Sequence, residues 1–167
     1  HRTQVGTEAY QDLLEERFQR YYRHGLSGLE PYVRGRRTDD PARELHIALD
    51  GFSFLEDHFP DFYSAILRDP VAQDEATEQL FVLHETESDG RTIHVLSRQL
   101  FEVQDAWGLG ADLQFYATHG LNAGFDLMGV VPYQQGSLVF ALFHLFTNEV
   151  LGLGSTLKKR IGRGRAT

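Results

Sequence analysis

The sequence contains no cysteine, and this absence removes disulfide bonds, thiolate metal sites and thiol nucleophiles from consideration. It also lacks any apolar run of about 18 residues, so no membrane-spanning helix is predicted. The most apolar stretch, 138–146 (LVFALFHLF), is far shorter and is typical of a buried strand. Motifs for nucleotide binding, for a serine nucleophile and for zinc are missing as well. The sequence therefore predicts no cofactor and no metal site.

Basic residues are scarce outside the last ten positions of the chain. The sequence has 16 Lys and Arg against 24 Asp and Glu, which gives a formal net charge of −8. Five of the basic residues stand at the C-terminus, and they are Lys158, Lys159, Arg160, Arg163 and Arg165. Without them, eleven basic residues remain against 24 acidic ones, and the rest of the chain carries −13. A surface this acidic repels a phosphate backbone, so nucleic-acid binding is not expected.

Length and composition are those of one folded domain. At 167 residues, with 41% hydrophobic, 12% aromatic and 24% charged residues, the chain is long enough to bury one real core. We predict a single soluble domain over 1–167, with disorder limited to about 1–6 and 163–167. The sequence begins at His1 without a methionine, which we interpret as the loss of a leader or of upstream residues. This leaves the compartment open between the cytoplasm and export.

Three segments in the first half have the pattern of helices. Apolar residues recur every three or four positions over 7–24. Asp40 followed by Pro41 predicts the start of a second helix, because aspartate caps helices and proline is tolerated at their first position. A break is expected at 58–61, followed by a short third helix that ends near Asp69-Pro70. The segment 25–35 is interpreted as irregular chain or as an edge strand.

From Thr77 onward, apolar and β-branched residues gather in segments that are separated by turn signals. The predicted strands are 78–87, 91–103, 111–119, 123–131 and 137–146. Asp89-Gly90 fits the two-residue turn of a hairpin, which places Glu85 opposite His94. A short helix over 156–161 is expected to follow. The predicted fold class is α+β, a curved antiparallel β-meander of five or six strands packed on N-terminal helices and a short C-terminal helix.

In element order this layout resembles the START-like or helix-grip proteins, in which a curved antiparallel sheet wraps a helix around an apolar cavity. It is also similar to the NTF2-like cone, whose N-terminal helices pack on a curved sheet around a pocket. Gly154-Ser155 followed by a terminal helix favours the first. Either resemblance implies an internal pocket for a small molecule. A sheet face filled by Phe and Leu side chains is the alternative.

Histidine is frequent in this sequence, with eight residues in all. Four lie in the predicted sheet, and they are His84, His94, His119 and His144. The apolar neighbours of His144 on its own strand face place it either in a pocket or in the core with a hydrogen-bond partner. Arg98 lies in the middle of an apolar strand, which indicates a carboxylate partner, an anionic ligand or an outward-facing position. The four sheet histidines either converge on one site, or each is separately exposed to solvent or hydrogen-bonded in the core.

Further candidates surround the turn that follows the third predicted strand. Tyr116 and Asp126 are expected to face each other across this hairpin, with His119 at its edge. Such a set handles protons, because the aspartate orients or accepts, the histidine acts as acid or base, and the tyrosine donates a hydrogen bond. The alternative is that His119 and Asp126 are exposed to solvent at the edge of the sheet and that Tyr116 is an ordinary buried residue.

Two functions follow from these candidates. The first is the binding of a hydrophobic or aromatic small molecule between sheet and helices. Its ligand-binding residues are expected to be Arg98, Tyr116, Phe140 and His144. The second is a cofactor-free isomerase, cyclase or dehydratase in the same cavity. Its catalytic residues are expected to be His119, Asp126 and His144. Docking of the acidic domain to a protein partner through its helices is a third interpretation, and the oligomeric state stays open.

Overall fold

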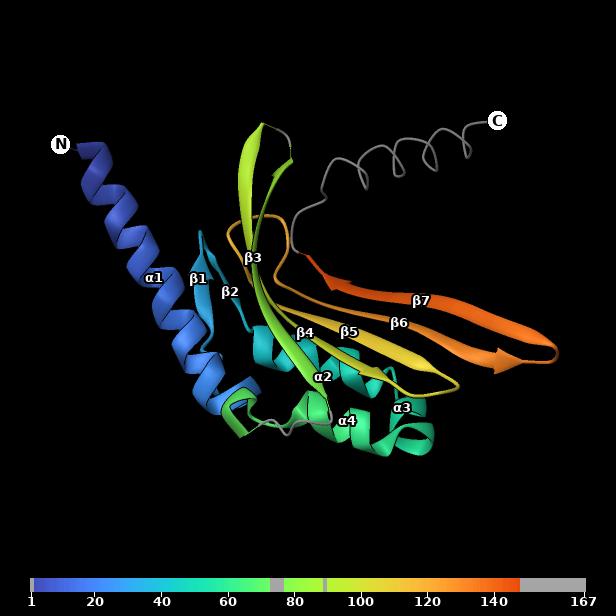
Figure 1. The fold of residues 1–167 in the computed structure, drawn as a ribbon. Helices are drawn as coiled ribbons and strands as arrows, with labels where there is room; N and C mark the ends of the chain where they lie inside the picture. Colours follow the sequence, from blue (N-terminus) through green and yellow to red (C-terminus); the bar gives the residue numbers. More distant parts are fainter. Residues whose placement is uncertain (1, 73–76, 89, 148–167) are drawn as a thin grey trace, which may run out of the picture.

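The structure, a computed structural model, describes residues 2–72, 77–88 and 90–147. Its helices are α1 (Arg2–His24), α2 (Pro41–Asp50), α3 (Phe54–His58) and α4 (Pro60–Leu67), with 3-10 turns η1 (Gly25–Gly28) and η2 (Pro70–Ala72). Its strands are β1 (Tyr32–Arg34), β2 (Arg37–Asp39), β3 (Glu78–Ser88), β4 (Arg91–Val103), β5 (Gly108–Ala117), β6 (Ala123–Tyr133) and β7 (Gly136–Phe146). The predicted α+β class with an antiparallel sheet is confirmed (Figure 1).

The large sheet is a five-stranded meander in which each strand pairs with its neighbours in sequence, from β3 to β7. α2 packs against β5 and β6, while α1 runs beside β3 (Figure 1). Ser88 pairs with Arg91, so the predicted two-residue hairpin is confirmed and Glu85 lies opposite His94. The expected helix over 156–161, on which the preference for a START-like layout depended, lies outside the described residues, as does the segment 163–167.

The two longer predicted helices form for the expected reasons. In α1, the residues that contact the sheet recur at helical spacing, and Gly25 follows the helix with a positive φ of 53°. In α2, the side chain of Asp40 accepts a hydrogen bond from the backbone N–H of Arg43 at 3.0 Å, and Pro41 occupies the first position. α1 begins at Arg2.

Several shorter elements differ from the prediction. The segment 25–35 divides into η1 and β1, and β1 forms a small hairpin with β2 that the sequence pattern did not indicate. Gly35 supplies the positive φ of 66° at its turn. The interruption expected at 58–61 is found at Phe59, but the short helix α3 that precedes it was not predicted. No helix in the described ranges is both long and apolar enough to cross a bilayer.

The sheet has two unlike faces. The inner face, which is turned to the helices, carries the core residues Leu100, Leu109, Leu113, Phe115, Phe125 and Leu127, all at most 3% exposed. The outer face carries large apolar residues that are 37–80% exposed. These are Leu80, Phe101, Val103, Met128, Val130, Val139, Phe143 and Leu145.

The prediction of a buried strand over 138–146 is wrong. β7 is the last strand of the described sheet, with β6 as its one neighbour, and most of its side chains are exposed. Phe140 and Phe146 pack against the core from the inner face. Val139 and Phe143, on the outer face, are 76% and 66% exposed. An apolar run of this kind predicts a strand, but it does not say how many neighbours the strand has.

Candidate functional site

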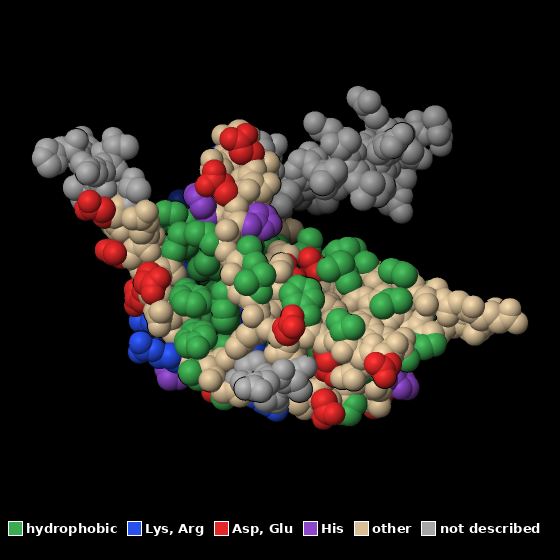
Figure 2. Space-filling model, in the orientation of Figure 1, with side chains coloured by type: hydrophobic (Ala, Val, Ile, Leu, Met, Phe, Trp, Pro, Cys, Tyr) green, Lys and Arg blue, Asp and Glu red, His purple; other side chains and the backbone are tan. Residues whose placement is uncertain are grey.

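A cleft of about 300 Å³ lies between α1 and the inner face of β3, β4 and β5. We call it the α1 cleft. Its apolar lining consists of Leu14, Phe18, Phe81, Val82, Leu83, Leu96 and Phe115, and the polar residues at its wall are Gln11, Glu15 and Ser97. Figure 2 shows apolar side chains along the gap between α1 and β3. An apolar hollow of this size is at the lower end of the range that small-molecule sites occupy, about 300–1,000 Å³.

Aromatic packing holds the C-terminal half of α1 against the sheet. Tyr21 is fully buried and stacks on Phe115, with 4.1 Å between ring centroids and 16° between ring planes. Phe18 meets Phe81 edge to face at 5.1 Å. Burial raises the pKa of Tyr21, and the nearby Arg98 guanidinium acts in the opposite direction. Nearer the N-terminus of α1, the Tyr10 ring lies 5.2 Å from that of His94, and the α1 cleft lies between this contact and the stack at Tyr21.

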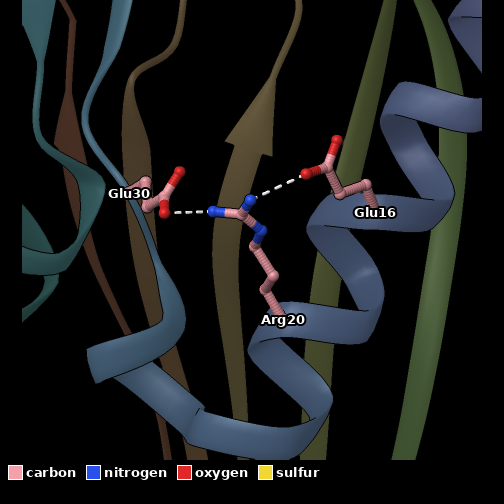
Figure 3. Close-up of polar contacts among 3 residues, drawn as sticks. All are labelled: Glu16, Arg20 and Glu30. Carbon is pink, nitrogen blue, oxygen red and sulfur yellow. Dashed lines mark hydrogen bonds and ion pairs between the residues drawn. The ribbon is translucent and has the colours of Figure 1, made fainter.

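Ion pairs connect α1 to the chain that leads into β1. Arg20 contacts Glu16 on α1 at 2.7 Å and also contacts Glu30, which follows η1 (Figure 3). The Glu30 carboxylate, more than that of Glu16, raises the pKa of Arg20. The three side chains are 40–70% exposed. Ion pairs this open to solvent contribute little to the free energy of folding.

A β-bulge turns two consecutive aromatic residues of β5 toward α1. The register between β4 and β5 shifts at Leu96 and Ser97, so that Ser97 pairs with Gln114 and Leu96 with Tyr116. Phe115 and Tyr116 are both buried as a result. Phe115 forms part of the cleft floor, while Tyr116 lies against the Arg17 guanidinium at 4.6 Å from the ring centroid. Strict alternation would have put one of the two rings on the outer face.

A polar group adjoins the apolar floor of the α1 cleft. Glu85 and His94 form the next inner-face pair along β3 and β4 after Leu83 and Leu96. His94 Nε2 lies 3.1 Å from Glu85 Oε2, and the His94 ring lies 5.2 Å from that of Tyr10. Tyr10, one turn before Leu14, therefore shares the α1 face that lines the cleft. We call Tyr10, Glu85 and His94 the polar trio.

Two hydrogen-bond donors near the trio are buried without an acceptor among the described residues, namely Tyr10 Oη and Arg17 Nε. Burial, reinforced by the charges of Tyr116 and Glu85, raises the pKa of Tyr10 to about 12. The Tyr10 hydroxyl therefore keeps its proton at every physiological pH. Buried polar atoms in folded proteins are nearly always paired, so an unpaired donor beside a cleft indicates a place for a ligand acceptor.

Two other hollows in the described part of the chain are less suited to an apolar ligand. One of about 80 Å³ next to Arg17 and Arg20 is too small for an organic molecule. The other, of about 370 Å³, lies between η1, α2 and α4. It has no aromatic side chain other than the imidazoles of His24 and His46, and Asp69 and Ser27 make its wall partly polar.

Arg98, a predicted ligand-binding residue, is fully buried under α4. Its guanidinium donates hydrogen bonds to the carbonyl oxygens of Arg68 at 3.0 Å and Ala65 at 3.4 Å, and to Gln79 Oε1 at 3.1 Å. A cation at these carbonyls also complements the dipole of α4. The outward-facing alternative for Arg98 is therefore wrong, and its observed bonds serve to position α4.

The other predicted residues do not converge on one cavity. Tyr116 lies beside the α1 cleft, whereas Phe140 and His144 lie two strands away on β7, where His144 stacks on Phe146 at 4.7 Å. His119 is exposed in the turn after β5.

The expectation that Tyr116 faces Asp126 is wrong. Asp126 pairs with Asp112 and points to the outer face, while the bulge keeps Tyr116 on the inner face. The same register places Phe125, not Asp126, beside His144. The three predicted catalytic residues His119, Asp126 and His144 are thus not brought together.

The polar trio was missed although one signal for it was present. The hairpin register already predicted Glu85 opposite His94, but no role was attached to that pair. In the sequence, Tyr10 is only one of the apolar residues that recur along one face of the helix at 7–24. Nothing in the sequence indicated which part of that stripe would lie over the hairpin, because this depends on how α1 is held at Tyr21.

No group of three or more His, Asp or Glu side chains in the described ranges is placed to hold a metal ion. No protein-family model, curated protein or solved structure matches this chain.

Proposed function

We propose that this protein binds an aromatic or otherwise apolar small molecule in the α1 cleft, with a hydrogen-bond acceptor of the ligand at the polar trio. The α1 cleft is the observation that carries this proposal, because it combines an apolar floor, three aromatic rings and an unpaired donor, Tyr10 Oη, one helical turn before Leu14. Of the residues expected to bind a ligand, Tyr116 is next to two cleft residues, because it follows Phe115 and pairs with Leu96.

The ligand chemistry follows from the lining. Phe18, Phe81 and Phe115 offer ring faces and edges to a flat apolar body. Tyr10 offers a protonated hydroxyl, so the matching ligand atom is a carbonyl, ether or phenolic oxygen. A small phenol such as 2-naphthol is therefore a suitable probe.

The test compares two substitutions on β3. Leu83 and Leu80 are 54% and 53% exposed, but Leu83 lines the α1 cleft and Leu80 is on the outer face. Isothermal titration with 2-naphthol should give one site for the wild type and for Leu80→Glu. Leu83→Glu should weaken binding by at least about tenfold, because it places a charge against the apolar ligand. Equal affinity of the two variants would contradict the proposal.

A second candidate function is favoured by the contact between Glu85 and His94. A histidine held by a carboxylate is the usual arrangement of a general base, and the Tyr10 hydroxyl can donate to a developing oxyanion. The reaction class is then cofactor-free proton transfer next to a carbonyl, as in an isomerase, cyclase or dehydratase.

This candidate is tested by following deuterium exchange at the activated carbon of 2-tetralone in D₂O by NMR. His94→Gln should slow exchange by about 100-fold or more, the usual contribution of a positioned base. His46→Gln, in an exposed histidine on α2, is the control and should leave the rate unchanged. If the wild type does not exceed the buffer rate, the cleft binds without catalysing this proton transfer.

A further inference from the structure

The outer face of the sheet exposes an apolar surface that is unusual for a lone domain. Its eight large apolar residues, defined above, are 37–80% exposed. At roughly 150 Å² for each residue when fully exposed, the lower end of the aromatic range because six of the eight are not aromatic, they leave on the order of 700 Å² open to water. The largest apolar patch on a typical monomer is about 300–600 Å². Part of this surface is visible over the strands to the right of β3 (Figure 2).

Basic charge is almost absent from this surface, whose acidic residues are Glu78, Asp112 and Asp126. The strands β3 to β7 contain two basic residues, of which Arg98 is buried on the inner face and Arg91 lies at the hairpin tip. Two carboxyl groups, Asp112 and Asp126, lie at the centre of the outer face. Gln114 donates to both of them, at 3.4 Å and 3.0 Å. Burial raises the pKa of both carboxyl groups, and the charge of Asp112 adds to the shift of Asp126, which brings its pKa to about 6. These groups are thus easier to neutralise than ordinary surface carboxyls.

We propose that two copies of this chain pack their outer faces against each other and form a two-fold symmetric dimer. A stable interface removes about 800 Å² from each partner, and the apolar residues of one outer face supply most of this area. A two-fold interface brings the same patch of both copies together, so it needs a surface that fits itself. A broad apolar sheet face without cations has this property, and sheets pack face to face at about 10 Å.

The partner is a second copy and not a nucleic acid or an anionic membrane, because a phosphate-binding surface needs basic residues, and β3 to β7 place none in the middle of the outer face. Pairing of the free β7 edges would leave Met128, at the middle of the face on β6, exposed as before. Face-to-face packing buries both Met128 and Phe143. The two modes of association therefore respond differently to a change at Met128.

The test is sedimentation velocity on the full chain at neutral pH, between about 1 and 100 µM. The wild type should sediment as a dimer, with twice the 19.0 kDa mass of the chain, at the upper end of this range. Phe143→Glu and Met128→Glu should each shift the chain to monomer. Leu83 is similarly exposed but lies on the inner face, so the Leu83→Glu variant should remain a dimer. Far-UV circular dichroism shows whether each variant is folded.

Three results would overturn the proposal. A wild type that stays monomeric at about 100 µM removes it. A dimer that survives Met128→Glu but not Phe143→Glu belongs to the β7 edge. A dimer that survives both substitutions uses another surface. Failure of this proposal leaves the α1 cleft untouched, because the cleft lies on the opposite face and is tested by Leu83→Glu.

Discussion

Phe125 and Phe143 lie on neighbouring strands, one residue pair apart in the register of β6 and β7. Phe125 is fully buried and meets Phe52 edge to face at 4.9 Å, whereas 66% of Phe143 is exposed. The two side chains are chemically identical, so their different burial reflects the helices, which pack on the inner face at this position. The same division separates the two proposals, since the α1 cleft lies on the inner face and the apolar dimer surface on the outer face.

The largest expected difference between the faces is in stability. Phe125→Ala should lower the free energy of unfolding by about 3–5 kcal/mol, because it leaves a cavity in the core. Phe143→Ala should lower it by less than about 1 kcal/mol in dilute solution, where self-association contributes little. Urea unfolding of both variants measures the contrast. Equal losses would mean that the outer face is covered within a single chain.

Arg98 and Gln99 extend this comparison to polar residues that are adjacent in β4. Arg98→Met should cost about 2–4 kcal/mol, because it leaves buried carbonyl oxygens at the end of α4 without a donor. Gln99→Met, on the outer face, should change stability by no more than about 1 kcal/mol. Thermal unfolding distinguishes them, and a neutral Arg98→Met would contradict the role assigned to the guanidinium in positioning α4.

The smallest effect is expected at Asp126 and depends on pH. Its pKa is about 6 in the folded protein and about 3.9 in an unfolded chain, so the folded state holds the proton more tightly. The stabilising contribution of this proton is complete below about pH 4 and is lost as pH rises through about 6. Asp126→Asn should therefore be more stable than the wild type at pH 8, with no gain at pH 4. A gain of the same size at both pH values would contradict the shift.

How far the sequence predicted the fold depends on whether the signal was local. The stripe of α1, the Asp40 cap and the hairpin at 88–91 are each encoded in a few neighbouring residues, and all were found. The edge position of β7 and the bulge at Tyr116 depend on neighbours that are distant in the chain. The apolar alternation of β7 is as strong on its outer side as on its inner side, so no pattern reveals which side the helices cover.

The candidate site could likewise be predicted only where its signal was local. The register of one hairpin was enough to pair Glu85 with His94, but the third member of the trio comes from α1, and its position depends on the stack of Tyr21 on Phe115. Tyr116 and Asp126 were assigned to one face by assuming uninterrupted alternation, and a single extra residue in β5 separates them.

The most direct test of the central claim is a ¹H–¹⁵N NMR titration of the wild-type chain with 2-naphthol. The account predicts saturable shifts that are centred on the amides around Leu14 and Phe18 in α1 and around Leu83 and Leu96 in the sheet, with the largest change near Tyr10 and His94. Shifts centred instead on Met128 and Phe143, or spread over both faces without saturation, would show that the probe binds to exposed apolar surface and would contradict a ligand site in the α1 cleft.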